Sequence, residues 1–180
     1  MTTTVLPPLQ VASRLGRVRR CLDEAGVDAL VVTTLANVRY LTGFTGSSGI
    51  VTITGGDVLL TTDGRYRTQS SEQLSAAGVA ETVRIEIGNA QAQRDAVRDL
   101  MKAQTATRIG LEADNVTWGA SQRWQEVFEG VGEILPTTAL VEGLRQVKDA
   151  GEVARMERAA AIADAALAEV LPLLASAVSS

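Results

Sequence analysis

Short β-branched runs alternate with amphipathic helical runs along most of this chain, and this alternation restricts the fold more than any other sequence feature. The first helical run has apolar residues spaced by four, three and four and ends near Gly26; they are Val11, Leu15, Val18 and Leu22. Residues 28–33 (DALVVT) follow and are apolar at consecutive positions, as is typical of a central strand covered on both faces. This order predicts a layered α/β fold.

The rest of the chain continues the alternation. Strand patterns at residues 49–54 and 58–62 flank the turn sequence Gly55-Gly56-Asp57 and predict a β-hairpin. Further runs predict a helix over 66–76, a strand over 83–87, a helix that Asn89 caps, a strand over 108–111, a helix over 118–128 and an edge strand over 133–136 that Pro136 terminates. The sequence therefore predicts a mixed sheet of five to six strands with helices on both faces.

The segment from Asp149 onward differs, because its apolar residues keep a spacing of three and four without interruption. They are Val153, Met156, Ala160, Ala163, Leu167, Val170 and Leu174. This pattern predicts a long C-terminal helix with a shallow, alanine-rich stripe, whose last turns Pro172 weakens. If the chain ends at Ser180, part of this stripe has no partner, so we expect its exposed apolar surface to promote self-association.

Composition narrows the classes of partner and compartment. With 180 residues and 46% apolar residues the chain can bury a core, and its net charge of −4 gives no reason to expect a nucleic-acid partner. The arginines at 14, 17, 19 and 20 lie on the first helical run and are interpreted as a solvated face. Neither a secretory signal nor a membrane span is apparent in the sequence. A single cysteine, Cys21, cannot form an internal disulfide. We therefore expect a cytoplasmic protein without membrane partners.

The chain contains no histidine, which limits the chemistry it can perform. Nucleophilic catalysis by Ser47, Ser48 or Cys21 needs a neighbouring base, and the two lysines, Lys102 and Lys148, fall on helices expected to be exposed. The acidic residues at 57, 63, 112 and 114 stand singly between elements, and we interpret them as turn and cap residues. We therefore predict neither catalytic nor metal-ligating residues in this chain.

The glycines of GFTGSSG, at positions 43, 46 and 49, are compatible with a phosphate-binding loop or with a sharp turn into a strand. The turn is favoured, because no Gly-Lys-Ser/Thr sequence follows and the next element reads as a strand. The tetrapeptide Asp63-Gly64-Arg65-Tyr66 is the most suggestive for chemistry, because it ends a strand at the rim of an open sheet. Arg65 there can bind a peptide carboxylate or a carboxylate of the protein itself.

Three blocks of sequence carry a resemblance to a known family. They are NVRYLTGFTGS at residues 37–47, LLTTDGRY at residues 59–66 with Gln69, and Leu144-Arg145-x-x-Lys148-Asp149-x-x-Glu152-Val153. In order and spacing they resemble the amino-terminal (creatinase/prolidase-type) domain of Xaa-Pro aminopeptidases and related proline dipeptidases. The first and second blocks are more similar to the aminopeptidase P branch than to creatinase, while prolidase-like dipeptidases remain an alternative.

The resemblance implies a ribonuclease H-like α/β domain over residues 1–145, with residues 146–180 forming a linker and the first helix of a missing metallopeptidase domain. That catalytic domain would hold two manganese, cobalt or zinc ions through two Asp, one His and two Glu, none of which maps onto this sequence. The chain is then expected to be inactive alone, to shape the active-site entrance for proline-containing peptides, and to build a dimer or larger homo-oligomer. Arg65 and Tyr66 become candidates for the substrate rim. The alternative is a stand-alone peptide-binding module of the same fold.

Overall fold

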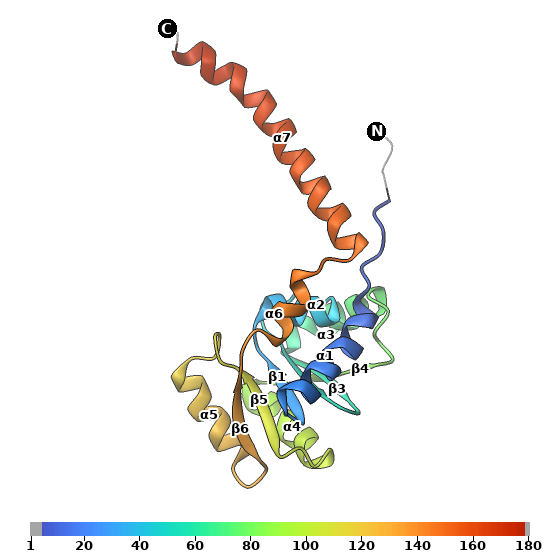
Figure 1. The fold of residues 1–180 in the computed structure, drawn as a ribbon, viewed down its shortest axis with the longest axis vertical. Coiled ribbons are helices and arrows are strands. Elements are labelled where there is room, and N and C mark those ends of the chain that lie inside the picture. Colours follow the sequence, from blue (N-terminus) through green and yellow to red (C-terminus); the bar gives the residue numbers. More distant parts are fainter. Residues whose placement is uncertain (1–4, 179–180) are drawn as a thin grey trace. The chain divides into compact units, whose positions relative to one another are not determined.

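The computed structural model describes residues 5–178, with side chains described as far as residue 172. The chain divides into two compact units: residues 11–146, and a second unit made of the segments before Val11 and after Gln146. Figure 1 shows the ribbon of both units. Each unit is described below by itself.

Residues 11–146 contain a mixed six-stranded sheet in the order β4-β3-β2-β1-β5-β6. Its strands are β1 (Ala29–Val32), β2 (Ile50–Thr54), β3 (Val58–Thr62), β4 (Val83–Ile87), β5 (Arg108–Glu112) and β6 (Glu133–Thr137). β2 is antiparallel to both β1 and β3, whereas the pairs β3–β4, β1–β5 and β5–β6 are parallel. The predicted hairpin is confirmed, with Ile53 opposite Val58 next to its turn. The predicted mixed sheet is confirmed as well.

Helices cover both faces of this sheet (Figure 1). They are α1 (Val11–Ala25), α2 (Leu35–Thr42), α3 (Arg67–Ala76), α4 (Ala90–Ala103), α5 (Trp118–Phe128) and α6 (Leu140–Gln146), with a short 3₁₀ turn, η1 (Gly64–Tyr66), before α3. On one face, α4 and α5 pack Val97, Met101, Trp124 and Phe128 against Ala29 and Val31 of β1. Leu30 and Val32 alternate with these strand residues and face the opposite layer, where α1, α2 and α6 contact one another.

Two helices, α2 and α6, are absent from the sequence-based prediction. They have eight and seven residues, too few for a helical spacing to stand out, and α6 also includes Gly143. α2 ends at Gly43, whose φ of +77° forms a left-handed cap that glycine adopts without strain. The predicted end of the last strand at Pro136 is also one residue short. β6 continues to Thr137, since proline is tolerated on an edge strand.

The second unit is built around α7 (Ala150–Val178), which confirms the predicted long helix. Asp149 and Glu152 form a reciprocal capping box, with N–H···O distances of 2.8 and 3.0 Å. The stripe is exposed at Met156 (58%) and Leu167 (55%), while the side chain of Leu174 lies outside the described residues. None of the described helices combines the length and apolar content that crossing a membrane requires.

The expectation of a solvated basic face on α1 is wrong for Arg14. Its side chain is buried, with 3% of its surface exposed. Arg14 Nη1 donates a hydrogen bond of 2.8 Å to the Tyr40 carbonyl, and the guanidinium lies 4.1 Å from the centre of the Tyr40 ring. Arg14 therefore belongs to the contact between α1 and α2, while Arg20 of the same helix is exposed as expected.

This contact predicts unequal effects for two arginines of one helix. Arg14→Met should lower the free energy of unfolding by about 2 kcal/mol, because a buried charge-assisted hydrogen bond and a ring contact are lost. Arg20→Met, the matched control, should change it by less than about 0.5 kcal/mol. Urea unfolding followed by circular dichroism measures both, and equal effects would show that Arg14 is not a packing residue.

Candidate functional site

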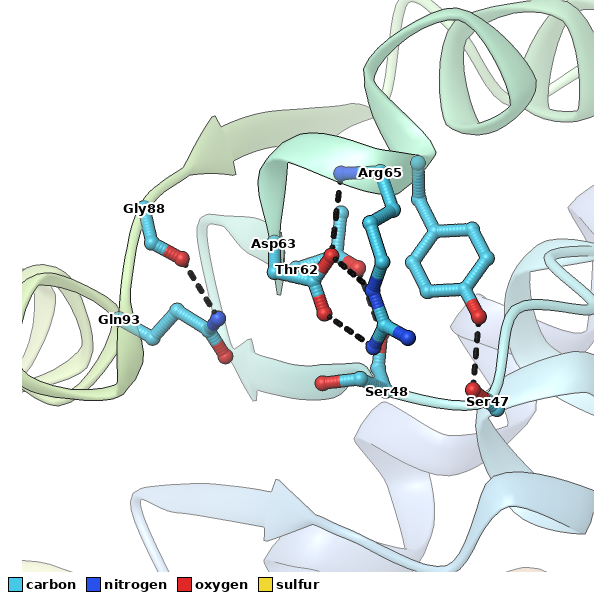
Figure 2. Close-up of polar contacts among 8 residues, drawn as sticks. Ser47, Ser48, Thr62, Asp63, Arg65, Gly88 and Gln93 are labelled. Atoms are coloured by element: carbon cyan, nitrogen blue, oxygen red, sulfur yellow. Dashed lines mark hydrogen bonds and ion pairs between the residues drawn. The ribbon is translucent and has the colours of Figure 1, made fainter.

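The candidate site lies at the sheet edge where the parallel strands β3 and β4 end. Asp63 follows β3, and Gly88 follows β4 with its N–H bonded to the Thr62 carbonyl at 3.0 Å. β2 runs antiparallel to β3, so the loop before β2 reaches the same edge. Thr62 Oγ1 donates to the Ser48 carbonyl at 2.5 Å and fastens this loop to β3 (Figure 2). The GFTGSSG loop and the tetrapeptide at residues 63–66, both considered for chemistry from the sequence, are therefore neighbours in space.

Asp63 holds Arg65 in a two-pronged ion pair. Arg65 Nε donates to Asp63 Oδ1 at 2.9 Å and Arg65 Nη2 donates to Oδ2 at 2.8 Å (Figure 2). The Arg65 backbone N–H also donates to Oδ1, at 3.0 Å, which caps η1. Arg65 is 69% exposed and Asp63 24%. The observed partner of the Arg65 fork is thus a carboxylate of the protein itself, which was one of the two alternatives from sequence.

The Arg65 guanidinium is the main cause that lowers the pKa of Asp63 from 3.8 to about 2, with smaller help from the Arg65 N–H and the Ser48 side chain. The same pair raises the pKa of Arg65. Asp63 therefore stays ionised under ordinary conditions. The pKa of Asp63 in the folded state lies below its ordinary value. The pair therefore stabilises the folded state in full above pH 3.8, and this stabilisation is lost as the pH falls through about 2.

Tyr66 is placed by a hydroxyl contact and a ring contact. Its hydroxyl lies 2.7 Å from Ser47 Oγ, and this hydrogen bond is the main cause that lowers the pKa of Tyr66. Its ring meets the buried ring of Phe44 edge-on, at 5.5 Å between centroids. Arg65 lies 5.2 Å from the centre of the Tyr66 ring. The two candidate rim residues therefore lie beside each other, with Ser47 as the third polar group.

The glycines of the loop make room for Phe44. A Cβ at Gly46 would lie 2.8 Å from Phe44 Cε1, and a Cβ at Gly49 would lie 3.0 Å from the same atom. Neither has a positive φ, and the element that follows is strand β2, as predicted. The loop also bonds to α3, since Thr45 Oγ1 accepts hydrogen bonds from Gln69 and Gln73. These contacts favour the turn over a phosphate-binding loop.

Sequence reasoning missed a second polar cluster, at the ends of β1 and β5. Asn37 is fully buried and donates to Glu112 Oε1 at 2.7 Å and to Glu142 Oε1 at 2.5 Å. Its Oδ1 accepts from Arg145 Nη1 at 2.9 Å. Spacing gives no sign of this cluster, because more than 70 residues separate Asn37 from each partner. The one signal is that Asn37 and Arg145 belong to separate blocks of the family resemblance.

Neither cluster has the composition of a metal centre or a nucleophile site. Among the described residues, no three Asp, Glu or Cys side chains come together in a way that could hold a metal ion. Cys21 is half-buried and not in a disulfide. Ser47 has a phenol as its partner rather than a base. The rim around residues 63–66 is therefore suited to hydrogen bonding and to contact with charged groups.

The ion pair makes a prediction at acidic pH. In Arg65→Gln the pKa of Asp63 should rise from about 2 towards 3.8, because its principal stabilising charge is removed. Carboxyl ¹³C NMR titration of Asp63 measures this shift directly. Arg67→Gln, at the exposed start of α3, is the matched control and should leave the titration unchanged. An Asp63 titration that is the same in Arg65→Gln and in the unmodified chain would show that the pair is not formed in solution.

Comparison with known proteins gives concordant matches. The family model described as the creatinase/prolidase N-terminal domain matches residues 14–147. An uncharacterized peptidase, YqhT, of Bacillus subtilis (strain 168) is 32% identical over 161 residues, which cover 89% of this chain and 43% of that protein. The solved Xaa-Pro dipeptidase from Bacillus anthracis is 31% identical with a TM-score of 0.81, and the match covers 91% of this chain and 43% of that one.

An isolated N-terminal domain gives a complementary match. The N-terminal domain of the cytoplasmic peptidase PepQ from Mycobacterium tuberculosis H37Rv is 28% identical with a TM-score of 0.65, over 73% of this chain and 98% of that one. The chain thus spans less than half the length of the longer relatives and nearly all of this domain. The expected fold and the resemblance read from three sequence blocks are both confirmed. The chain belongs to the creatinase/prolidase N-terminal domain family.

Proposed function

We propose that this chain is the non-catalytic N-terminal domain of a proline-specific metallopeptidase, in which it shapes the active-site entrance and contributes to oligomerisation. The observation that carries the proposal is the family match over residues 14–147, together with coverage of only 43% of the longer peptidase relatives. The reaction we assign to the parent is removal of an N-terminal residue before proline. A proline dipeptidase is the related alternative, and the similarity to the solved Xaa-Pro dipeptidase from Bacillus anthracis supports it.

The domain boundary in this proposal falls at residue 145. Residues 1–145 form the N-terminal domain, and residues 146–180 form the linker and first helix of the catalytic domain. The different coverage of the solved structures supports this division. The isolated PepQ domain matches 73% of this chain, whereas the longer dipeptidase matches 91%. The additional coverage is what we expect if the C-terminal helix belongs with the catalytic part.

We assign the metal chemistry to that catalytic part. The described residues include no suitable group of ligands, so the two divalent ions expected in the parent, manganese, cobalt or zinc, do not fit here. A solved relative from Caenorhabditis elegans is described as a cytosolic X-prolyl aminopeptidase with a di-nuclear active site. We propose a cytoplasmic location for this protein too, in keeping with that description and with that of PepQ.

We propose Arg65 and Tyr66 as residues that border the peptide path. The exposure of Arg65, the position of half-buried Tyr66 beside it and the paired hydroxyls of Tyr66 and Ser47 support this role. The fork of Arg65 already binds Asp63, so a substrate carboxylate would have to share it. A backbone carbonyl or amide of the peptide can instead exchange hydrogen bonds with the Tyr66 hydroxyl.

The experiment that tests the proposal compares two lengths of the protein. The 180-residue chain with Mn²⁺ should not hydrolyse an Xaa-Pro peptide, because it lacks the ligands, whereas the longer polypeptide from the same reading frame should. A coupled assay for released amino acid measures both. Turnover by the 180-residue chain contradicts the proposal. Peptide binding by both lengths without turnover by either supports the alternative, a stand-alone peptide-binding module.

The exposed stripe of α7 generates a prediction about homo-oligomers. The 180-residue chain should self-associate at micromolar concentration, because adjacent exposed apolar residues favour burial against a second copy. Truncation after Asp149 should shift sedimentation velocity towards the monomer. The triple variant Met156→Gln, Leu167→Gln, Val170→Gln changes exposed residues of the stripe but keeps the helix length, and it should also shift towards the monomer. Sedimentation unchanged by both alterations would rule out this surface.

A further inference from the structure

Helix α6 is held in place with unusually little apolar contact. It has seven residues, too few to be stable by itself in water. Val141 is its buried residue, with 1% of its surface exposed, while Leu140 and Leu144 are half-buried. Since one buried valine contributes only about 2 kcal/mol, the position of α6 must depend on its polar contacts as well.

Those polar contacts converge on the amide of Asn37 in α2. One amide hydrogen is donated to Glu142 of α6 and the other to Glu112 at the end of β5, while Oδ1 accepts from Arg145 of α6. Asn37 Nδ2 therefore has both of its hydrogens engaged. Glu112 Oε2 in turn accepts from the backbone N–H groups of Thr33, at 2.7 Å, and Thr34, at 2.8 Å. The network connects α6 to the carboxyl ends of both central parallel strands.

The last turn of α6 has a second attachment, at the Leu144 carbonyl. This carbonyl accepts from the Tyr40 hydroxyl at 3.3 Å and from Arg17 Nη2 at 3.5 Å. Carbonyls in the last turn of a helix have no partner within the helix, so side chains of α1 and α2 supply one here. Both the side chains and the C-terminal end of α6 are thus held by groups outside it.

We propose that these contacts form a latch, the α6 latch, made of Asn37, Tyr40, Glu142, Arg145 and the Leu144 carbonyl. With the latch closed, α6 is part of the unit of residues 11–146. With it open, α6 unfolds locally while the sheet remains folded. Most of the contacts that α6 then loses are polar, and the core on the α4 and α5 face keeps its packing.

A small cavity beside the latch makes this opening feasible. It has a volume of about 20 Å³, and Glu112, Asn115, Thr137 and Glu142 are among the residues that line it. A cavity of this size has room for a water molecule, and its polar lining offers hydrogen-bond partners. Water can therefore begin to replace the contacts of Asn37 before α6 has left its place.

Opening changes the length of chain that follows the sheet domain. Residues 140–146 rise about 1.5 Å each as a helix and can span up to about 3.3 Å each when extended. At this end the second unit would then be joined to residues 11–146 by a longer and more flexible tether, while its other connection, at Gln10–Val11, stays as it is. The latch thus governs how firmly the point of exit from this unit is fixed, and this inference does not depend on the proposed peptidase function.

Native-state hydrogen exchange of the 180-residue chain, read by NMR, tests the latch. Arg145→Met removes a contact on α6 itself and should speed exchange of the amides of residues 143–146 by about tenfold. Strand amides that exchange by unfolding of the whole unit should speed up by a similar factor, because this contact is lost in the unfolded state too. The variant that separates local from global opening is therefore Val97→Ala. Asn37→Asp, which places a third carboxylate against Glu112 and Glu142, should speed α6 exchange further. The matched control Val97→Ala lies in the core of the opposite face and should speed exchange in β1 and β5 while leaving α6 unchanged.

Two results would overturn the proposal. If Val97→Ala accelerates α6 and the strands by equal factors, α6 opens only with the whole unit. If residues 143–146 already exchange at unfolded rates in the unmodified chain, no latch is closed in solution. Should Asn37→Asp fail to fold, Tyr40→Phe replaces it, with acceleration of α6 again expected.

Discussion

The burial of β1 on both faces is the constraint on which the rest of the sheet domain depends. All four residues of β1 have 0% of their surface exposed, which requires a layer of helices on each side. β1 also joins the antiparallel half of the sheet, through β2, to the parallel half, through β5. Because β1 and β5 are parallel, the segments at their carboxyl ends meet at one edge of the sheet, where Asn37 and Glu112 bond.

The three sequence blocks of the family resemblance are contact surfaces rather than independent motifs. The first block meets the second where Ser47 bonds to Tyr66, and meets the third where Asn37 bonds to Arg145. Phe44 of the first block packs edge-on against Tyr66 of the second. A change in one block therefore disturbs its partner block. This gives a physical reason why order and spacing together identify the family better than any one block.

Sequence reasoning worked where a pattern repeats locally, and failed where a contact joins distant residues. The strands and the longer helices follow from apolar spacing, and the pairing of β2 with β3 follows from the turn at Gly55. The short helices α2 and α6 offer too few turns to show a period. The burial of Arg14 depends on Tyr40, 26 residues away, and the role of Asn37 depends on Arg145, 108 residues away. The position of Arg65 and Tyr66 just after a strand could be predicted, but the partners of each came only from the fold, and their role at a substrate rim stays a prediction.

The partner of Arg65 changes what the rim can select. A free guanidinium fork would favour any peptide with an exposed carboxylate, but here Asp63 occupies Nε and Nη2 and neutralises the charge. Solvent screens an exposed ion pair and leaves it weak, so a substrate carboxylate with further contacts can compete with Asp63, whereas a carboxylate alone gains little. In the proposed role, these residues would favour ligands that also engage the hydroxyls of Tyr66 and Ser47. Selection would then depend on the shape and backbone of the peptide more than on its charge.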